Sequence, residues 1–233
     1  MLQKILQLPI ETMRMSKAIR LKRYFSMLLS HSTSSKILNL IRVESELRQQ
    51  AIHLRGIPYI LKIESTNLCN LHCRVCYENR KSHNFEGGRG YGKMNLDLFC
   101  SLIDEIGKYV YRINLYGFGE PLIYDKTIDM IRYATNRNIS VGITSNFNTV
   151  DEGIMERILL SGLEHLVISI DGIDQRSYEK YQVGGDFNKV MKNIRTFQKM
   201  KEKMKKNLPF LDWQFLIMKH NAHMRAQAEA IAN

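Results

Sequence analysis

Three of the four cysteines in this 233-residue chain lie within eight residues, as Cys69, Cys73 and Cys76. Thiolates at this spacing can wrap one loop around a zinc ion or an iron–sulfur cluster. A structural zinc site needs four ligands, and no second pair of cysteines follows, while His72 would strain the same loop as a fourth ligand. A [4Fe–4S] cluster held by three thiolates instead leaves one iron open for chemistry. Cys100 lies in an amphipathic stretch, where we expect a small buried core residue.

Downstream of the cysteines, short apolar runs bounded by turn residues alternate with longer stretches of helical periodicity. This alternation predicts βα units around a parallel sheet, and therefore the α/β fold class. The expected strands are 59–65, 111–118, 140–146, 165–171 and 211–219. The expected helices are 95–109, 126–137, 150–161 and 187–206, with a last helix that begins near Asn221.

Polar or glycine-rich residues stand where each of the first four expected strands ends. In parallel α/β folds the functional site collects at these carboxyl ends, so such residues are candidates for binding. The cysteine loop follows the first strand, and the next three ends carry Gly117, Gly119, Glu120 and Pro121, then Ser145 and Asn146, then Ser169 and Asp171. The alternatives are a strand-to-helix turn at Gly117 to Pro121 and a helix cap at Asp171.

The cysteine motif and these strand ends together resemble the radical S-adenosylmethionine (SAM) superfamily. The three cysteines match the C-x3-C-x2-C signature of that family residue for residue. In the family, the position before the last cysteine is commonly aromatic and packs near the adenine. Here Val75 holds that position and Tyr77 follows the cysteine, so both are cofactor-binding candidates.

The resemblance implies roles for the other strand ends. The segment from Gly117 to Pro121 is similar to the motif that holds the amino group of the methionine part of SAM, with Glu120 as an acceptor. Ser169 and Asp171 match positions that contact the ribose or the methionine carboxylate. Ser145 and Asn146 match a strand end that lines the same pocket.

The resemblance also implies a domain organisation. The expected fold is a partial (β/α)6 TIM-like barrel with about five βα units, over residues 58–233, after a basic and mainly helical extension over residues 1–57. Residues 178–194 are similar to the SPASM or twitch subgroup, which carries a further cluster domain. Since the family barrel has six units, we expect a chain that is incomplete at its C-terminus, and such a barrel can hold a cluster without being active.

The function implied by the resemblance is reductive cleavage of SAM by a [4Fe–4S] cluster, which gives a 5′-deoxyadenosyl radical. That radical would abstract hydrogen from a peptide or protein side chain, or from a small, sugar-type substrate. An electron donor such as flavodoxin or ferredoxin would supply the electron. The residues alone leave two alternatives open, a zinc module that binds nucleic acid and a cluster protein that only carries electrons.

The formal net charge of +11 is unevenly distributed along the chain. Residues 1–60 carry a net charge of +7 and residues 195–206 carry +5, whereas residues 61–194 carry −1. A nucleic-acid partner is not expected, because it would need basic residues that converge on one face, and the sequence does not show such a face. The acid-free stretch between Thr12 and Val43 fits a helix packed on the domain, a basic helix on a membrane surface, or a transit peptide. No apolar run could cross a membrane, and an oxygen-sensitive cluster predicts a cytoplasmic location.

Overall fold

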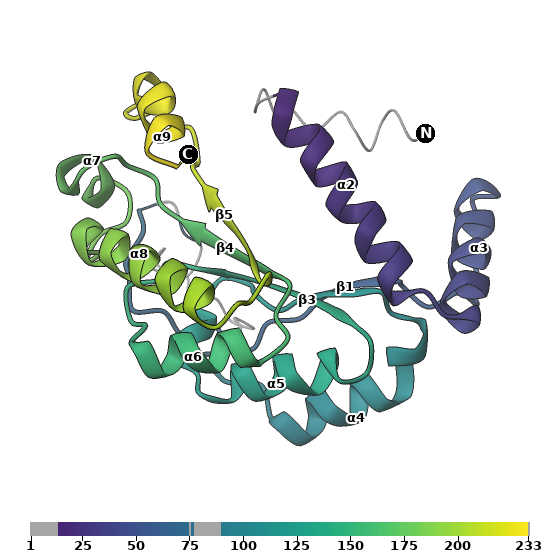
Figure 1. Cartoon of the computed structure of the whole chain (residues 1–233). Coiled ribbons are helices and arrows are strands. Elements are labelled where there is room, and N and C mark those ends of the chain that lie inside the picture. Colours follow the sequence, from purple (N-terminus) through teal and green to yellow (C-terminus); the bar gives the residue numbers. More distant parts are fainter. Residues whose placement is uncertain (1–13, 75, 77–89, 233) are drawn as a thin grey trace.

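Five parallel strands form one sheet in the computed structural model, which describes residues 14–74, 76 and 90–232 (Figure 1). Each strand pairs with the next one along the chain, so the order across the sheet is β1 to β5. The strands are β1 (Ile60–Lys62), β2 (Arg112–Asn114), β3 (Ser140–Ser145), β4 (His165–Ser169) and β5 (Phe210–Gln214). Every strand overlaps a range expected from the sequence, which confirms the parallel α/β fold with five βα units.

Helices connect successive strands, as parallel pairing requires. They are α4 (Leu96–Ile106) and η3 (Gly107–Tyr109), η4 (Pro121–Ile123) and α5 (Lys126–Thr135), α6 (Glu152–Leu160), and α7 (Gln175–Glu179) and α8 (Phe187–Lys203), followed after β5 by η5 (Ala222–Met224) and α9 (Arg225–Ala232). The short elements η4 and α7 were not expected from the sequence, because a single turn shows no apolar periodicity.

Short polar side chains start four of these helices. Asn95, Asp151, Asp174 and Asp186 each accept a hydrogen bond from the backbone N–H three residues later. These bonds satisfy one of the free N–H groups in the first turn of each helix. The residue that caps the helix after β4 is therefore Asp174, so the capping alternative for Asp171 is wrong.

Alternate strand residues face opposite sides of the sheet, and the two faces differ in chemistry. One face is apolar and is covered by α4, α5, α6 and α8 (Figure 1). The residues of the opposite face, here called the inner face, are mostly polar. It consists of Ile60, Lys62, Arg112, Asn114, Ser140, Gly142, Thr144, His165, Val167, Ser169, Phe210, Asp212 and Gln214.

The arginine on the inner face depends on a glycine beside it. A Cβ atom at Gly142 would lie 2.6 Å from Nη2 of Arg112, so the guanidinium occupies the space that a side chain would fill. The Arg112 Nε donates to Oδ1 of Asn114 at 2.9 Å. The positively charged Arg112 side chain therefore extends from β2 over Gly142 of β3 on the inner face.

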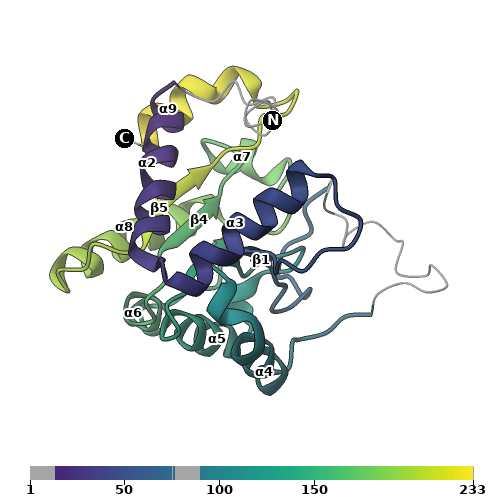
Figure 2. The same cartoon turned by 90° about the vertical axis from the view of Figure 1, so that its right-hand side faces the viewer.

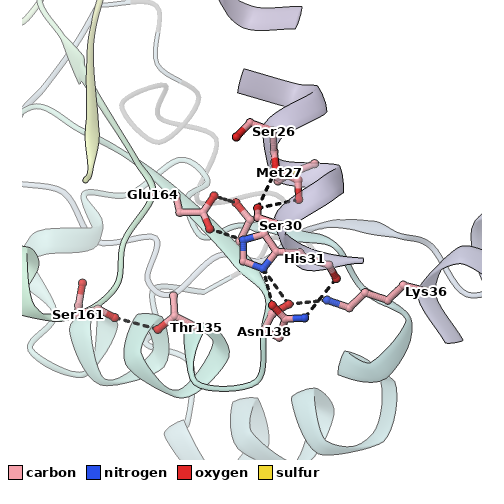
Figure 3. Close-up of polar contacts among 10 residues, drawn as sticks. Ser26, Met27, Ser30, His31, Lys36, Thr135, Asn138, Ser161 and Glu164 are labelled. Atoms are coloured by element: carbon pink, nitrogen blue, oxygen red, sulfur yellow. Dashed lines mark hydrogen bonds and ion pairs between the residues drawn. The ribbon is translucent and has the colours of Figure 1, made fainter. Parts of the chain in front are cut away.

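Two helices, α2 (Arg14–His31) and α3 (Ser34–Arg48), precede the sheet and attach to its amino-terminal end. Figure 3 shows the His31 imidazole between Glu164, which precedes β4, and Asn138, which precedes β3. The Lys36 ammonium is almost fully buried and donates to the carbonyl of Asn138. The expected helical extension is confirmed, and these contacts hold it against the domain.

The extension makes further contacts at the last strand and at the proposed domain boundary. Arg23 Nη1 donates to both carboxylate oxygens of Asp212 at 2.7 and 2.8 Å, and its guanidinium lies 4.4 Å above the Phe210 ring. The Asn39 side-chain amide exchanges two hydrogen bonds with the backbone of Ile57, at 2.8 and 2.9 Å. The division at residue 57 stays a prediction.

Cys100 differs from its expected position. It is only partly buried, because Phe99 and Ile103 form the core face of α4 and Cys100 lies beside that face. Among the residues that the structure describes, no helix is both long and apolar enough to cross a membrane.

Candidate functional site

The cysteine loop leaves the carboxyl end of β1 through a stem that is fixed by asparagine and threonine side chains. Asn67 donates through Nδ2 to the carbonyl of Gly90 at 2.8 Å and accepts from the N–H of Gly92 at 2.7 Å. The Thr66 hydroxyl donates to the carbonyl of Gly92 at 2.9 Å. These bonds close the base of the loop before the first cysteine.

The loop then rests on the segment that follows α7. The N–H of His72 donates to the carbonyl of Val183 at 2.9 Å, and the N–H of Arg74 donates to that of Tyr181 at 3.1 Å. Leu71 is 2% exposed and anchors the loop in the protein. The loop that carries the cysteines is therefore held at its base and along the segment that follows α7.

Two of the three thiols lie in surroundings that disfavour the thiolate. Burial raises the pKa of Cys69, and burial together with the Cys69 and Cys76 thiols and Asp171 raises the pKa of Cys73 to about 12. The three sulfur atoms therefore lie close enough together to influence one another. In the part of the chain that the structure describes, no three His, Cys, Asp or Glu side chains form a ready metal site. The donors themselves, three thiols on one anchored loop, fit an iron–sulfur cluster.

The glycines after β2 are required by close contacts with the cysteine loop. A Cβ atom at Gly119 would lie 2.2 Å from the carbonyl oxygen of Thr66 and 2.6 Å from that of Leu68. A Cβ atom at Gly117 would lie 2.1 Å from the Glu64 carboxylate. Gly119 thus lets the backbone after β2 approach the backbone after β1. A strand-to-helix turn alone would not require this close approach.

Glu120 connects the ends of β2 and β3 through a buried carboxylate. It accepts from the Ser145 hydroxyl at 2.8 Å, from the N–H of Asn146 at 2.7 Å and from the N–H of Leu122 at 3.0 Å. Burial raises its pKa to about 7, against the effect of these donors. Both carboxylate oxygens accept hydrogen bonds from other residues of the chain, so Glu120 links the ends of β2 and β3. Pro121, also buried, begins the η4 turn directly after it.

Asn146 joins the end of β3 to the cysteine loop. Its Nδ2 donates to Oδ1 of Asn70 at 2.9 Å and lies 3.9 Å from the Cys69 sulfur. Its Oδ1 accepts from the N–H of Asn148 at 3.0 Å. The structure therefore brings together Cys69, Glu120, Ser145 and Asn146, all of them predicted site residues.

Asp171 lies at the end of β4, buried and close to Cys73. Its Oδ1 accepts from the N–H of Leu216 at 2.6 Å, and burial raises its pKa to about 6. The strand end itself is held by Gln182, which donates to the carbonyl of Ser169 at 2.9 Å and accepts from the N–H of Asp171 at 2.8 Å. Ser169 belongs to the inner face. Val75 and Tyr77 lie outside the described residues.

Four amide side chains that sequence reasoning missed hold the strand ends in place. They are Asn67, Asn148, Gln182 and Asn221, all buried and hydrogen-bonded. Asn67 and Asn221 follow the first and fifth expected strands, so the rule used for the other strand ends could have found them. No sequence signal points to Gln182, because its partners depend on how the segment after α7 folds back.

Comparison with known proteins places this site in a family. A model described as the Radical SAM superfamily matches residues 63–211. The AdoMet-dependent heme synthase of Methanosarcina barkeri is 25% identical over 149 residues, which cover 64% of this chain and 41% of that protein. The GTP 3',8-cyclase of Clostridium botulinum is 31% identical over 152 residues, which cover 61% of this chain and 44% of that protein. The chain thus spans less than half the length of these curated relatives.

Solved structures share the fold at low sequence identity. The crystal structure of Streptococcus suis SuiB bound to S-adenosylmethionine matches with a TM-score of 0.61 and 15% identity, over 82% of this chain and 39% of that one. Native anSMEcpe with bound AdoMet matches with a TM-score of 0.57 and 15% identity, over 74% of this chain and 47% of that one. Since the family model covers more than half of the chain, the protein belongs to the Radical SAM superfamily, whose cofactors are a [4Fe–4S] cluster and SAM.

Proposed function

We propose that this chain is the catalytic core of an enzyme that cleaves SAM reductively and passes the resulting radical to a substrate. The observation that carries the proposal is the three-cysteine loop, which contacts the ends of β2 and β3 and the segment that follows α7. When bound and reduced, the cluster supplies the electron that splits the sulfur–C5′ bond of SAM, giving a 5′-deoxyadenosyl radical that abstracts hydrogen.

Cys69, Cys73 and Cys76 would hold the cluster through their sulfur atoms. Asn146 would orient the Cys69 sulfur, since its amide lies 3.9 Å from that atom. The raised thiol pKa values mean that the thiols must release protons when they become ligands. Their partial burial also limits the access of water to the sulfur atoms.

Residues at the other strand ends would bind SAM. Backbone carbonyls from Gly117 to Gly119 would accept from the methionine ammonium, as the similarity of this segment to the family motif implies. Glu120 would act through Ser145 and Asn146, whose positions it fixes. Ser169 and Asp171 would contact the ribose end, and Val75 and Tyr77 remain candidates for the adenine.

The partners follow from the chemistry and from the relatives. An electron donor such as flavodoxin or ferredoxin would reduce the cluster. The substrate would be a peptide or a small molecule, because the relatives include a PqqA peptide cyclase and a GTP 3',8-cyclase. Membership of the SPASM or twitch subgroup is part of the same proposal. A reducing cytoplasm suits the four free cysteines and an open iron.

The test is anaerobic reconstitution of the chain with iron and sulfide, followed by dithionite and SAM. We expect a brown protein that forms 5′-deoxyadenosine. The Cys73→Ser variant should lose both iron and product. Cys100→Ser is the matched control, since Cys100 lies on α4 away from the loop, and it should retain both.

Three results would contradict the proposal. A colourless protein that retains zinc would indicate a structural metal site. A brown protein that neither binds SAM nor cleaves it would indicate an electron carrier. Equal iron contents in the Cys73→Ser variant and the unaltered chain would exclude Cys73 as a ligand.

A further inference from the structure

The two sides of helix α2 have different surroundings. One side is fixed to the domain by the ion pair of Arg23 with Asp212, by the buried Met27 and by the contact of His31 with Glu164 (Figure 3). These residues recur every four positions, so they form one stripe along the helix. The rotation of α2 about its own axis is therefore set, and its opposite side cannot turn inward.

The opposite side is apolar and exposed to solvent. Leu21 and Phe25 are each 53% exposed and Leu29 is 80% exposed, and they follow one another at four-residue intervals. Lys22 lies beside them, and an open depression is lined by Lys22, Phe25, Ser26, Leu29 and Ser30. We call Leu21, Lys22, Phe25 and Leu29 the outer stripe. It extends about 12 Å along the helix.

The charge of α2 distinguishes between the partners that could cover this stripe. The helix sequence contains Arg14, Lys17, Arg20, Lys22 and Arg23 and no acidic residue. Arg23 pairs with Asp212, whereas Lys22 is exposed within the outer stripe, and the sequence of the helix adds three further basic residues and no acidic one. A surface that receives the stripe must therefore combine an apolar layer with negative charge, which is the chemistry of an anionic lipid bilayer.

We propose that the outer stripe of α2 binds the surface of an anionic membrane, with Phe25 and Leu29 entering the boundary between headgroups and acyl chains. The helix would lie on the bilayer, because no described helix could span it. Figure 2 shows α2 on the side of the molecule that faces the viewer, where a flat surface can approach it, and its Arg23 contacts β5 behind it. The proposal is independent of the SAM chemistry at the carboxyl ends of the strands.

The test is flotation of the whole chain with lipid vesicles. One set contains phosphatidylcholine alone, and the other contains about one third phosphatidylserine. We expect binding to the anionic set that weakens as salt increases. The double variant with Phe25→Ser and Leu29→Ser should bind roughly tenfold more weakly or worse, and Lys22→Glu about tenfold more weakly.

A matched control uses exposed leucines on other helices. Leu98 on α4 is 63% exposed and Leu160 on α6 is 53% exposed, so replacing both by serine removes similar apolar surface without touching α2. This variant should bind vesicles as the unaltered chain does. Equal binding to both vesicle sets would overturn the proposal, and so would unchanged binding by the double variant. Self-association of the chain that depends on Phe25 and Leu29, without vesicle binding, would instead assign the stripe to a second copy.

Discussion

The two ends of the sheet are stabilised by different means. At the carboxyl end, buried amides and glycines hold the strand ends in place through contacts with the main chain, as Gln182 and Gly119 do. At the amino end, charged side chains from a distant segment close the sheet, as His31 and Lys36 do. Amide contacts with the main chain bring loops close together without placing charged pairs among them, so this end is suited to a ligand. The amino end is suited to stability.

The carboxylates at the two ends have pKa values shifted in opposite directions. Burial raises the pKa of Glu120 to about 7 at the carboxyl end. At the amino end, burial alone would also raise the pKa of Glu164, but hydrogen bonds from His31 and Ser140 and nearby imidazoles hold it below its ordinary value. One end therefore accommodates a carboxylate that tends to bind a proton, and the other accommodates an ion pair.

The largest effect is expected from Gly119→Ala at the carboxyl end. The new methyl group would overlap the carbonyl oxygens of Thr66 and Leu68, and backbone atoms cannot move aside as a flexible side chain would. We expect a loss of about 3 kcal/mol in the free energy of unfolding, together with loss of iron binding. Urea denaturation and iron analysis measure the two effects.

The control for this substitution is Gly90→Ala, because a Cβ atom at Gly90 would have no atom within 4 Å. Its unfolding free energy should stay within about 0.5 kcal/mol of the unaltered chain. A Gly119→Ala variant as stable as the Gly90→Ala variant would show that the two strand ends do not approach as closely as described.

A smaller loss, about 2 kcal/mol, is expected from Glu164→Gln at the amino end. The change removes the negative charge that pairs with His31, and it leaves the buried Lys36 without a nearby carboxylate. Thermal denaturation measures the loss. Glu156→Gln on the exposed side of α6 is the matched control and should be nearly neutral. Equal melting temperatures for the two variants would mean that the extension is not held by this pair.

The smallest effect concerns pH. The pKa of Glu120 rises from 4.5 to about 7 on folding, so between these values the folded chain binds more protons than the unfolded chain. The free energy of unfolding should therefore fall as pH rises through this range. Glu120→Gln cannot ionise, so its stability should fall less between pH 5 and pH 7, by on the order of 1 kcal/mol. Parallel stability curves for the variant and the unaltered chain would refute the assignment.

The carboxyl end was largely predictable from the sequence, because its signals are local. The cysteines, Gly119 and Asn146 each stand directly after an apolar run, and the order of the strands follows the order of the chain. The same local pattern left Asp171 with two interpretations, because an aspartate between a strand and a helix can contact a ligand or cap the helix. The cap is Asp174, three residues later. Only the folded structure distinguishes them.

The amino end was not predictable in the same way. A mainly helical extension was predictable from the sequence, and α2 and α3 agree with it among the described residues, but their contact partners were not predictable. His31 contacts Glu164 across 133 positions of sequence, and Arg23 contacts Asp212 across 189. No periodicity or motif in one segment identifies the other, because such pairs depend on the completed sheet.

These long separations impose an order on folding during synthesis. The strands can pair one after another as they leave the ribosome, since each has its neighbour immediately before it in the chain. Helix α2 emerges before all of them, yet its anchor at Glu164 follows the third strand and its anchor at Asp212 lies in the fifth. An early helix of the described residues is thus among the last of them to reach its final place.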